Sequence, residues 1–188
     1  MKSAIILHGM PSKEEYFNCD RSSQSNSHWL PWLQQQLIVN GVLTQTPELP
    51  EPYLPVYEEW CKVFEQFTID EDTTLVGHSC GAGFLLRWLS ENKIEVGKVV
   101  LVAPWFDPVK EIQNNFFDFE IDRDILQRVE VMSIFVSSDD EKTVLDSVEI
   151  ITKQLPQVEV KRFEGKGHFT FGDMKTEKFP ELLEYILG

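Results

Sequence analysis

The sequence has few basic residues, and this imbalance argues against two kinds of partner. It contains 17 Lys and Arg against 31 Asp and Glu, so its formal net charge is −14. Proteins bind nucleic acids and anionic membrane surfaces through clustered Lys and Arg, and we therefore expect neither as a partner. The excess of acidic residues is better explained by a solvated cytoplasmic surface than by a specialised acidic tail.

Long hydrophobic runs are missing as well. No stretch of the chain approaches the ~18 consecutive apolar residues that a membrane-spanning helix requires. The apolar run at residues 4–7 is too short for the core of a signal peptide. We expect a cytoplasmic protein with no membrane span.

The sequence is also poor in cysteine and lacks the spacing of metal ligands. Its three cysteines, Cys19, Cys61 and Cys80, are an odd number without a short paired spacing. This argues against a disulfide framework or a zinc knuckle and fits a reducing compartment. Because no His-x-x-x-His or other paired ligand spacing occurs either, we predict no metal site and no cofactor.

Six short apolar segments alternate with amphipathic helical patterns along the chain. A strand, a helix and a second strand within ~30 residues are typical of a right-handed crossover in a parallel sheet. No repeat or linker divides the chain, so residues 1–188 are predicted to form a single-domain three-layer α/β/α sandwich with a mostly parallel sheet. The strand-like segments cover residues 4–7, 42–46, 73–76, 98–104, 131–140, which ends in two carboxylates, and 158–163.

Local patterns indicate where several helices begin, end or face solvent. We expect the first long helix to begin near Ser27, as a possible N-cap, and to end around Asn40-Gly41. The prolines of residues 47–52 predict a stiff connection without regular hydrogen bonding. In the helix that follows residue 80, we expect Arg87, Ser90 and Glu91 on the solvent side.

The pattern Gly77-x-Ser79-x-Gly81 has the form of a nucleophile elbow. An apolar strand-like run precedes it and a helical pattern follows, which is the context that such a motif requires. The two glycines are needed because strand and helix pass closely on either side of the serine. The N–H of Cys80 lies in the first helical turn, has no intrahelical partner and is therefore a candidate oxyanion donor.

A second oxyanion donor is expected from the loop after the first strand. This loop reads His8-Gly9-Met10-Pro11, and Pro11 has no N–H, so the backbone N–H of Met10 is the candidate. The alternative is that these residues form an ordinary strand-ending turn.

Three groups with catalytic chemistry each follow a predicted strand. They are the elbow serine Ser79, the pair Asp139-Asp140, and His168. The carboxyl ends of parallel strands share one edge of a sheet, so these groups can converge there. Their chain order, Ser then Asp then His, is that of the α/β-hydrolase triad. Either aspartate can orient His168, and we expect the other to cap the helix beginning near Glu141.

Two segments and the remaining histidines have weaker assignments. The polar loop 12–27 is predicted to border a substrate pocket. The aromatic segment 105–119 either lines a hydrophobic acyl or alcohol pocket or covers the core. His8 and His78 flank turns and are expected to be positional, while His28 is expected to pack or hydrogen bond at a helix start.

The sequence resembles the small serine hydrolases of the retinoblastoma-binding protein 9 type, a compact branch of the α/β-hydrolase superfamily. By this resemblance Ser79 is the nucleophile, His168 the base and Asp140 the orienting carboxylate. The sequence differs from that type in the Gly-poor loop 11–27 and at residues 141–143, which concern the oxyanion loop and the substrate. The resemblance is carried by residues 5–9, 28–29, 32–33, 76–82, 137–140 and 167–169.

Together these patterns predict a serine hydrolase with a small-molecule ester-type substrate. We expect cleavage of a carboxylic ester, or else of a thioester or amide, through an acyl-enzyme. Two alternatives are a non-catalytic binding protein with the same fold and an acyltransferase with the same triad.

Overall fold

Six parallel strands form a single sheet. A computed structural model describes residues 1–188, and its strands lie in the order β2-β1-β3-β4-β5-β6, with every neighbouring pair parallel. This confirms the α/β fold class expected from the sequence. The strands are β1 (Ser3–Leu7), β2 (Leu43–Gln45), β3 (Thr73–His78), β4 (Val96–Val102), β5 (Val129–Ser137) and β6 (Glu159–Phe163).

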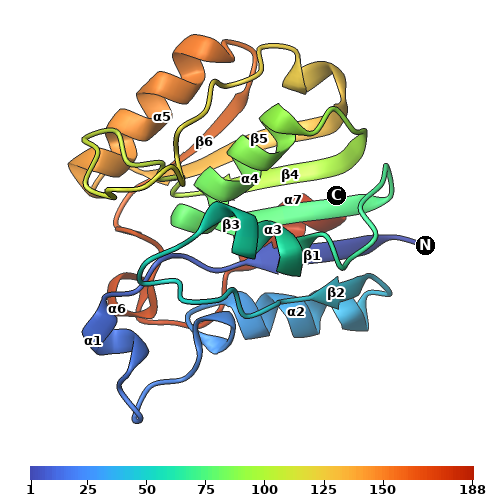
Figure 1. Ribbon diagram of the computed structural model, residues 1–188. Helices are drawn as coiled ribbons and strands as arrows, with labels where there is room; N and C mark the ends of the chain where they lie inside the picture. The colour runs from blue at the N-terminus through green and yellow to red at the C-terminus, as the bar shows by residue number, and fades with distance from the viewer.

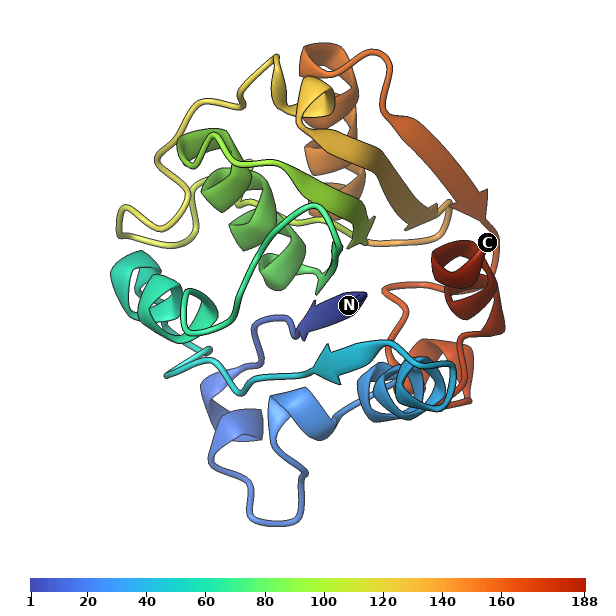
Figure 2. The ribbon, with the colours of Figure 1, turned by 90° about the vertical axis from the view of Figure 1, so that its right-hand side faces the viewer.

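Helices cover both faces of this sheet (Figures 1 and 2). One face carries α2 (Leu30–Val39) and α7 (Pro180–Leu187), and the other carries α3 (Tyr57–Phe64), α4 (Cys80–Glu91) and α5 (Lys142–Gln154). None of the helices is long and apolar enough to cross a membrane. The short helices are α1 (Lys13–Tyr16), η1 (Gln24–Asn26), η2 (Ile125–Gln127) and α6 (Phe171–Met174).

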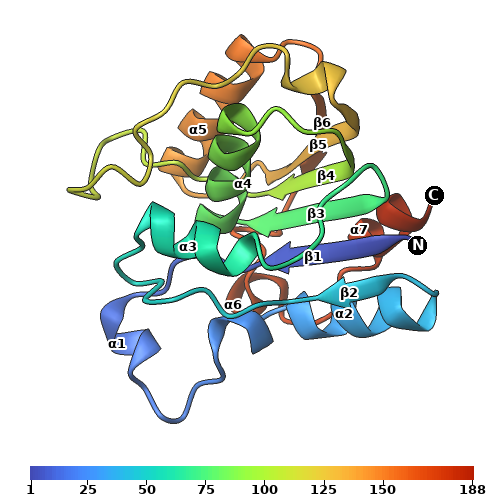
Figure 3. The same cartoon turned by 45° about the vertical axis from the view of Figure 1, so that its right-hand side comes forward.

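The strand order places a crevice between the ends of β1 and β3. From β1 the chain crosses outward to β2, and it then returns past β1 to β3, so the two crossovers cover opposite faces. The register pairs Leu7 with Gly77, so the loop after β1 and the turn after β3 begin at the same level. In Figure 3 the strand arrows point away from both termini, and in Figure 1 α1 and α6 lie beyond the carboxyl ends of the strands.

The central strands are apolar on both sides because helices cover both. Successive residues of a strand point to opposite faces, and both members of the pairs Leu75-Val76 in β3 and Val99-Val100 in β4 are fully buried. Continuous apolar runs of this kind are the reason that the strands could be predicted from the sequence. The Pro-rich residues 47–52 form no helix or strand, as expected.

The start of α2 differs from the expected one. Ser27 does not cap this helix, because its hydroxyl donates to the Ser23 carbonyl oxygen at 3.0 Å and its backbone ends η1. The helix begins at Leu30, with Pro31 in its first turn, where the fixed φ of proline suits a helix start. Its end was predicted correctly, since Gly41 follows with a φ of 81°.

The expectation that Arg87 and Ser90 face solvent is wrong. Arg87 is only 7% exposed and Ser90 only 5%, although both lie on α4 opposite the sheet. The Arg87 guanidinium lies 3.5 Å from the centre of the Tyr57 ring and donates to the Phe116 carbonyl oxygen at 2.8 Å. The segment after β4 folds back over α4. It forms no helix or strand there, so its backbone carbonyl groups need other partners, and Arg87 donates to two of them.

Candidate active site

Ser79 occupies a strained turn between β3 and α4. Its φ is 54°, a left-handed value that non-glycine residues seldom adopt. A Cβ on Gly77 would lie 2.6 Å from the Ala82 Cα, and one on Gly81 would overlap the His8 carbonyl oxygen. The strand, turn and helix expected around this serine are therefore present, and both glycines are required by close backbone approach.

Ser79, His168 and Asp140 form one chain of hydrogen bonds. The Ser79 Oγ lies 2.8 Å from His168 Nε2, and His168 Nδ1 lies 2.9 Å from Asp140 Oδ1. The Asp140 side chain is fully buried, whereas that of His168 is 22% exposed. The three groups expected at the carboxyl edge thus meet, although they are separated by 89 and 28 positions in the chain.

The two neighbouring aspartates have different partners. Asp139 does not cap α5, because its Oδ1 accepts the N–H groups of Gly165 and Gly167 at 3.0 and 3.3 Å. Both glycines have positive φ, which turns their N–H groups toward this carboxylate. The Ser137 hydroxyl and these amides hold the pKa of Asp139 below its ordinary value. Asp139 therefore shapes the loop that carries His168.

The backbone of His168 is held as firmly as its ring. Its N–H donates to Asp173 Oδ2 at 3.0 Å, and its carbonyl oxygen lies 2.8 Å from His78 Nε2, which must therefore be the protonated nitrogen of His78. Sequence reasoning missed Asp173. The capping-box spacing from Thr170 to Asp173 was the signal that could have found it, since the same carboxylate oxygen accepts from Thr170.

The peptide between Gly9 and Met10 is oriented by the ring of His8. The Leu49 N–H donates to His8 Nε2 at 2.9 Å, so in the neutral ring the proton lies on Nδ1, which donates to the Gly9 carbonyl oxygen at 2.8 Å. The C=O and N–H of one peptide point in opposite directions. The Met10 N–H consequently points away from His8, and it has no partner within the chain; the same is true of the Cys80 N–H.

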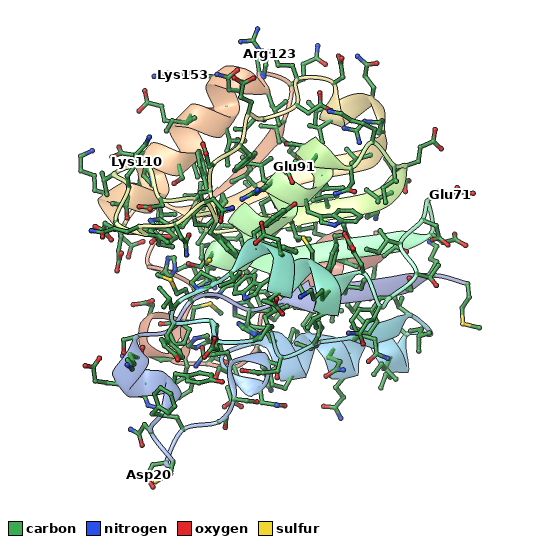
Figure 4. All side chains as sticks on the ribbon, in the orientation of Figure 1. Asp20, Glu71, Glu91, Lys110, Arg123 and Lys153 are labelled. Atoms are coloured by element: carbon green, nitrogen blue, oxygen red, sulfur yellow. The ribbon has the colours of Figure 1, made fainter.

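A cavity of about 650 Å³ lies over Ser79 and His168. Residues 8–11 form one side of it, and the loop 12–27, which we call the cap, forms another. The cap includes α1 and η1, and Asp20 stands at its outer tip (Figure 4). The expectation that this loop borders the pocket is confirmed.

The aromatic segment 105–119 does not line this cavity. Phe116 is fully buried, and its ring centre lies 4.9 Å from that of Trp60. Phe116 therefore covers the core, as in the second interpretation, whereas Phe106, Phe117 and Phe119 line a separate cavity of about 370 Å³ that does not include Ser79. No group of three or more His, Cys, Asp or Glu side chains lies close enough together to hold a metal ion.

A parallel sheet with an elbow serine after β3 defines the class of the protein as an α/β-hydrolase. The serine hydrolase family model matches residues 21–186, and the chain belongs to that family. It is similar to the putative hydrolase YdeN of Bacillus subtilis strain 168, with 29% identity over 150 residues, or 74% of this chain and 72% of YdeN. The protein is a hydrolase.

Solved structures agree on the fold. The crystal structure of the ydeN gene product from B. subtilis matches with a TM-score of 0.82 and 24% identity, over 100% of this chain and 97% of that one. Est1E from Butyrivibrio proteoclasticus, solved with bound ferulic acid, matches with a TM-score of 0.67 and 12% identity, over 100% and 88% of the two chains.

The buried histidines His8 and His78 make stability depend on pH. Burial lowers the pKa of both, and the neighbouring His168 and His28 lower that of His78 further. Below the ordinary value of 6.5 the unfolded chain takes up protons that the folded chain does not, so stability is lost as pH falls. Each ring contributes a slope of up to about 1.4 kcal/mol per pH unit.

We therefore expect the free energy of unfolding, measured with urea, to fall between pH 7.5 and 5.5. The variant His78→Gln should show a shallower slope over the same range, because it lacks one of the rings that burial keeps neutral. A slope that is the same in both proteins would contradict this assignment.

Proposed function

We propose that this protein hydrolyses carboxylic esters through an acyl-enzyme formed on Ser79. The observation that carries the proposal is the continuous chain from Ser79 through His168 to Asp140, with bonds of 2.8 and 2.9 Å. A serine hydroxyl is a poor nucleophile at neutral pH until a base takes its proton. The geometry supports this role for His168.

In the first half of the reaction, His168 Nε2 accepts the hydroxyl proton while Ser79 Oγ attacks the ester carbonyl carbon. Negative charge develops on the carbonyl oxygen, and the unpartnered N–H groups of Met10 and Cys80 are its proposed donors. The positive end of the α4 dipole adds to this stabilisation. The C–O bond then breaks, and the departing alcohol takes the proton from His168.

In the second half, a water molecule repeats the same steps. His168 accepts a proton from the water while the water oxygen attacks the acyl carbon. His168 then returns that proton to Ser79 Oγ as the bond to the acyl carbon breaks and the acid leaves. Asp140 stabilises the imidazolium in both halves, because the bond from Nδ1 fixes the orientation of the ring.

Within the serine hydrolase family, we infer that the chain is close to the retinoblastoma-binding protein 9 type. The motifs at residues 76–82, 137–140 and 167–169 support this inference. A small-molecule ester fits the cavity over Ser79, whose volume lies within the range of ordinary ligand sites. An acyltransferase would use the same groups, and it would be recognised by added alcohols competing with water for the acyl group.

The nucleophile can be tested with a fluorophosphonate probe, which reacts with activated serines. We expect the wild-type protein to be labelled and to hydrolyse p-nitrophenyl acetate, and the variant Ser79→Ala to do neither. Labelling of the alanine variant, or its absence in the wild type, would refute the proposal.

The two aspartates should differ sharply when each is changed to asparagine. We expect Asp140→Asn to lower kcat by about 10⁴, as in other triads, because the amide cannot hold the required His168 tautomer. Asp139→Asn is the matched control, since an amide oxygen still accepts the N–H groups of Gly165 and Gly167. Equal losses, or a larger loss at Asp139, would show that the assignment is wrong.

The role of His8 can be divided between its two ring nitrogens. In His8→Asn the amide NH₂ takes the place of Nδ1 and can still donate to the Gly9 carbonyl oxygen. In His8→Gln the amide oxygen takes the place of Nε2 and can accept only from Leu49.

We expect the Gln variant to lose up to about 10² in kcat, the lower end of the effect of removing one oxyanion donor, with little change in KM. The Asn variant should lose less than about 10-fold in kcat. Rates are divided by the fraction of protein that the fluorophosphonate labels. Equal losses in both variants would mean that His8 only fills space.

A further inference from the structure

The cavity over Ser79 offers little to an apolar substrate. Of the 19 residues that line it, only 2 are hydrophobic. The cap contributes carboxylate, guanidinium, hydroxyl and amide side chains, and the loop after His168 adds Thr170 and Glu177. A long acyl chain bound here would bury almost none of its apolar surface against the protein.

One side chain in the wall of this cavity, His28, is placed by an unusual backbone conformation. Its φ of 58° belongs to the left-handed region, which histidine seldom adopts and which can mark a functional constraint. The centre of its ring lies 5.8 Å from that of His78, and the ring of His78 lies 5.1 Å from that of His168. The His28 ring therefore stands beside the groups that surround Ser79.

The partners of His28 determine which of its nitrogens is free. The Phe171 N–H donates to its Nδ1 at 3.1 Å, so in the neutral ring the proton lies on Nε2. Burial and the nearby His168 lower the pKa of His28, which favours this neutral form. Nε2 has no hydrogen-bond partner in the protein, and the side chain lines the cavity.

We propose that the substrate is a hydrophilic ester with an oxygen atom outside the reacting carbonyl group, and that the Nε2–H of His28 donates a hydrogen bond to that oxygen. This rests on the proposed function of Ser79. His28 is then a residue that determines specificity: it binds the substrate and transfers no proton. The proposal replaces the hydrophobic acyl pocket considered from the sequence with a polar one built from the cap and His28.

The polarity of the site is tested first with p-nitrophenyl acetate, butyrate, hexanoate and octanoate. An apolar acyl pocket would raise kcat/KM by about 4-fold for each CH₂ that it buries. We expect no such rise beyond the butyrate. A steady increase of that size up to the octanoate would overturn the proposal.

The donor is tested with two pairs of esters that differ only by an oxygen in place of a CH₂. One pair places the change in the acyl half, p-nitrophenyl methoxyacetate against butyrate. The other places it in the alcohol half, 2-methoxyethyl acetate against butyl acetate. For each pair, the kcat/KM of the ester with the extra oxygen is divided by the kcat/KM of its CH₂ counterpart. This ratio is compared between the wild-type protein and each variant, which cancels the intrinsic reactivity of the esters.

The variants are His28→Asn and His28→Gln. The Asn side chain tolerates a left-handed φ and its oxygen can accept from Phe171, but it ends before the position of Nε2. The Gln side chain places an NH₂ near that position. We expect the Asn variant to lower the ratio by about 3- to 10-fold in one of the two pairs, the effect of one neutral hydrogen bond, and the Gln variant to retain it.

A ratio unchanged by His28→Asn in both pairs would refute the role of His28, as would an equal fall in both variants. These outcomes differ from a failure of the proposed function. If ester hydrolysis were not carried out by Ser79, the wild-type protein would resist the fluorophosphonate and hydrolyse none of the esters.

Discussion

The active site depends on a close contact between the first turn of α4 and the loop after β1. Gly81 lies so near the His8 carbonyl oxygen that no larger residue fits, and a Cβ on Gly9 would lie 3.0 Å from the Ser79 Cβ. This contact brings the loop after β1, with the Met10 N–H, to the serine that follows β3. The strand order makes it possible, because the chain leaves β1 and returns at β3 on opposite faces of the sheet.

Around this contact, carboxylates and neutral imidazoles hold backbone segments in place. Asp139 and Asp173 each accept backbone N–H groups of the His168 loop, and neither touches Ser79. His8 and His78 act through their ring N–H groups on backbone carbonyls. His8 also accepts the Leu49 N–H through Nε2, which it can do only while the ring is neutral, and burial favours the neutral form of both rings.

Much of the fold and of the candidate site could be predicted from the sequence, and the exceptions share a cause. Buried parallel strands are continuous apolar runs, and the order of Ser79, Asp140 and His168 limits which groups can meet. Arg87 could not be placed, because it is buried by a segment without helix or strand about 28 positions away. For the same reason the partners of Asp139 depend on a loop more than 20 residues further along the chain.

The bond from His78 to the His168 carbonyl oxygen has a consequence for how such an enzyme can change. His78 is the residue next to Ser79, so this bond ties the His168 loop to the same strand end as Ser79. The cap contributes none of the hydrogen bonds that join Ser79, His168 and Asp140. Substitutions in the cap would therefore change the wall of the cavity and leave the hydrogen bonds between Ser79, His168 and Asp140 in place.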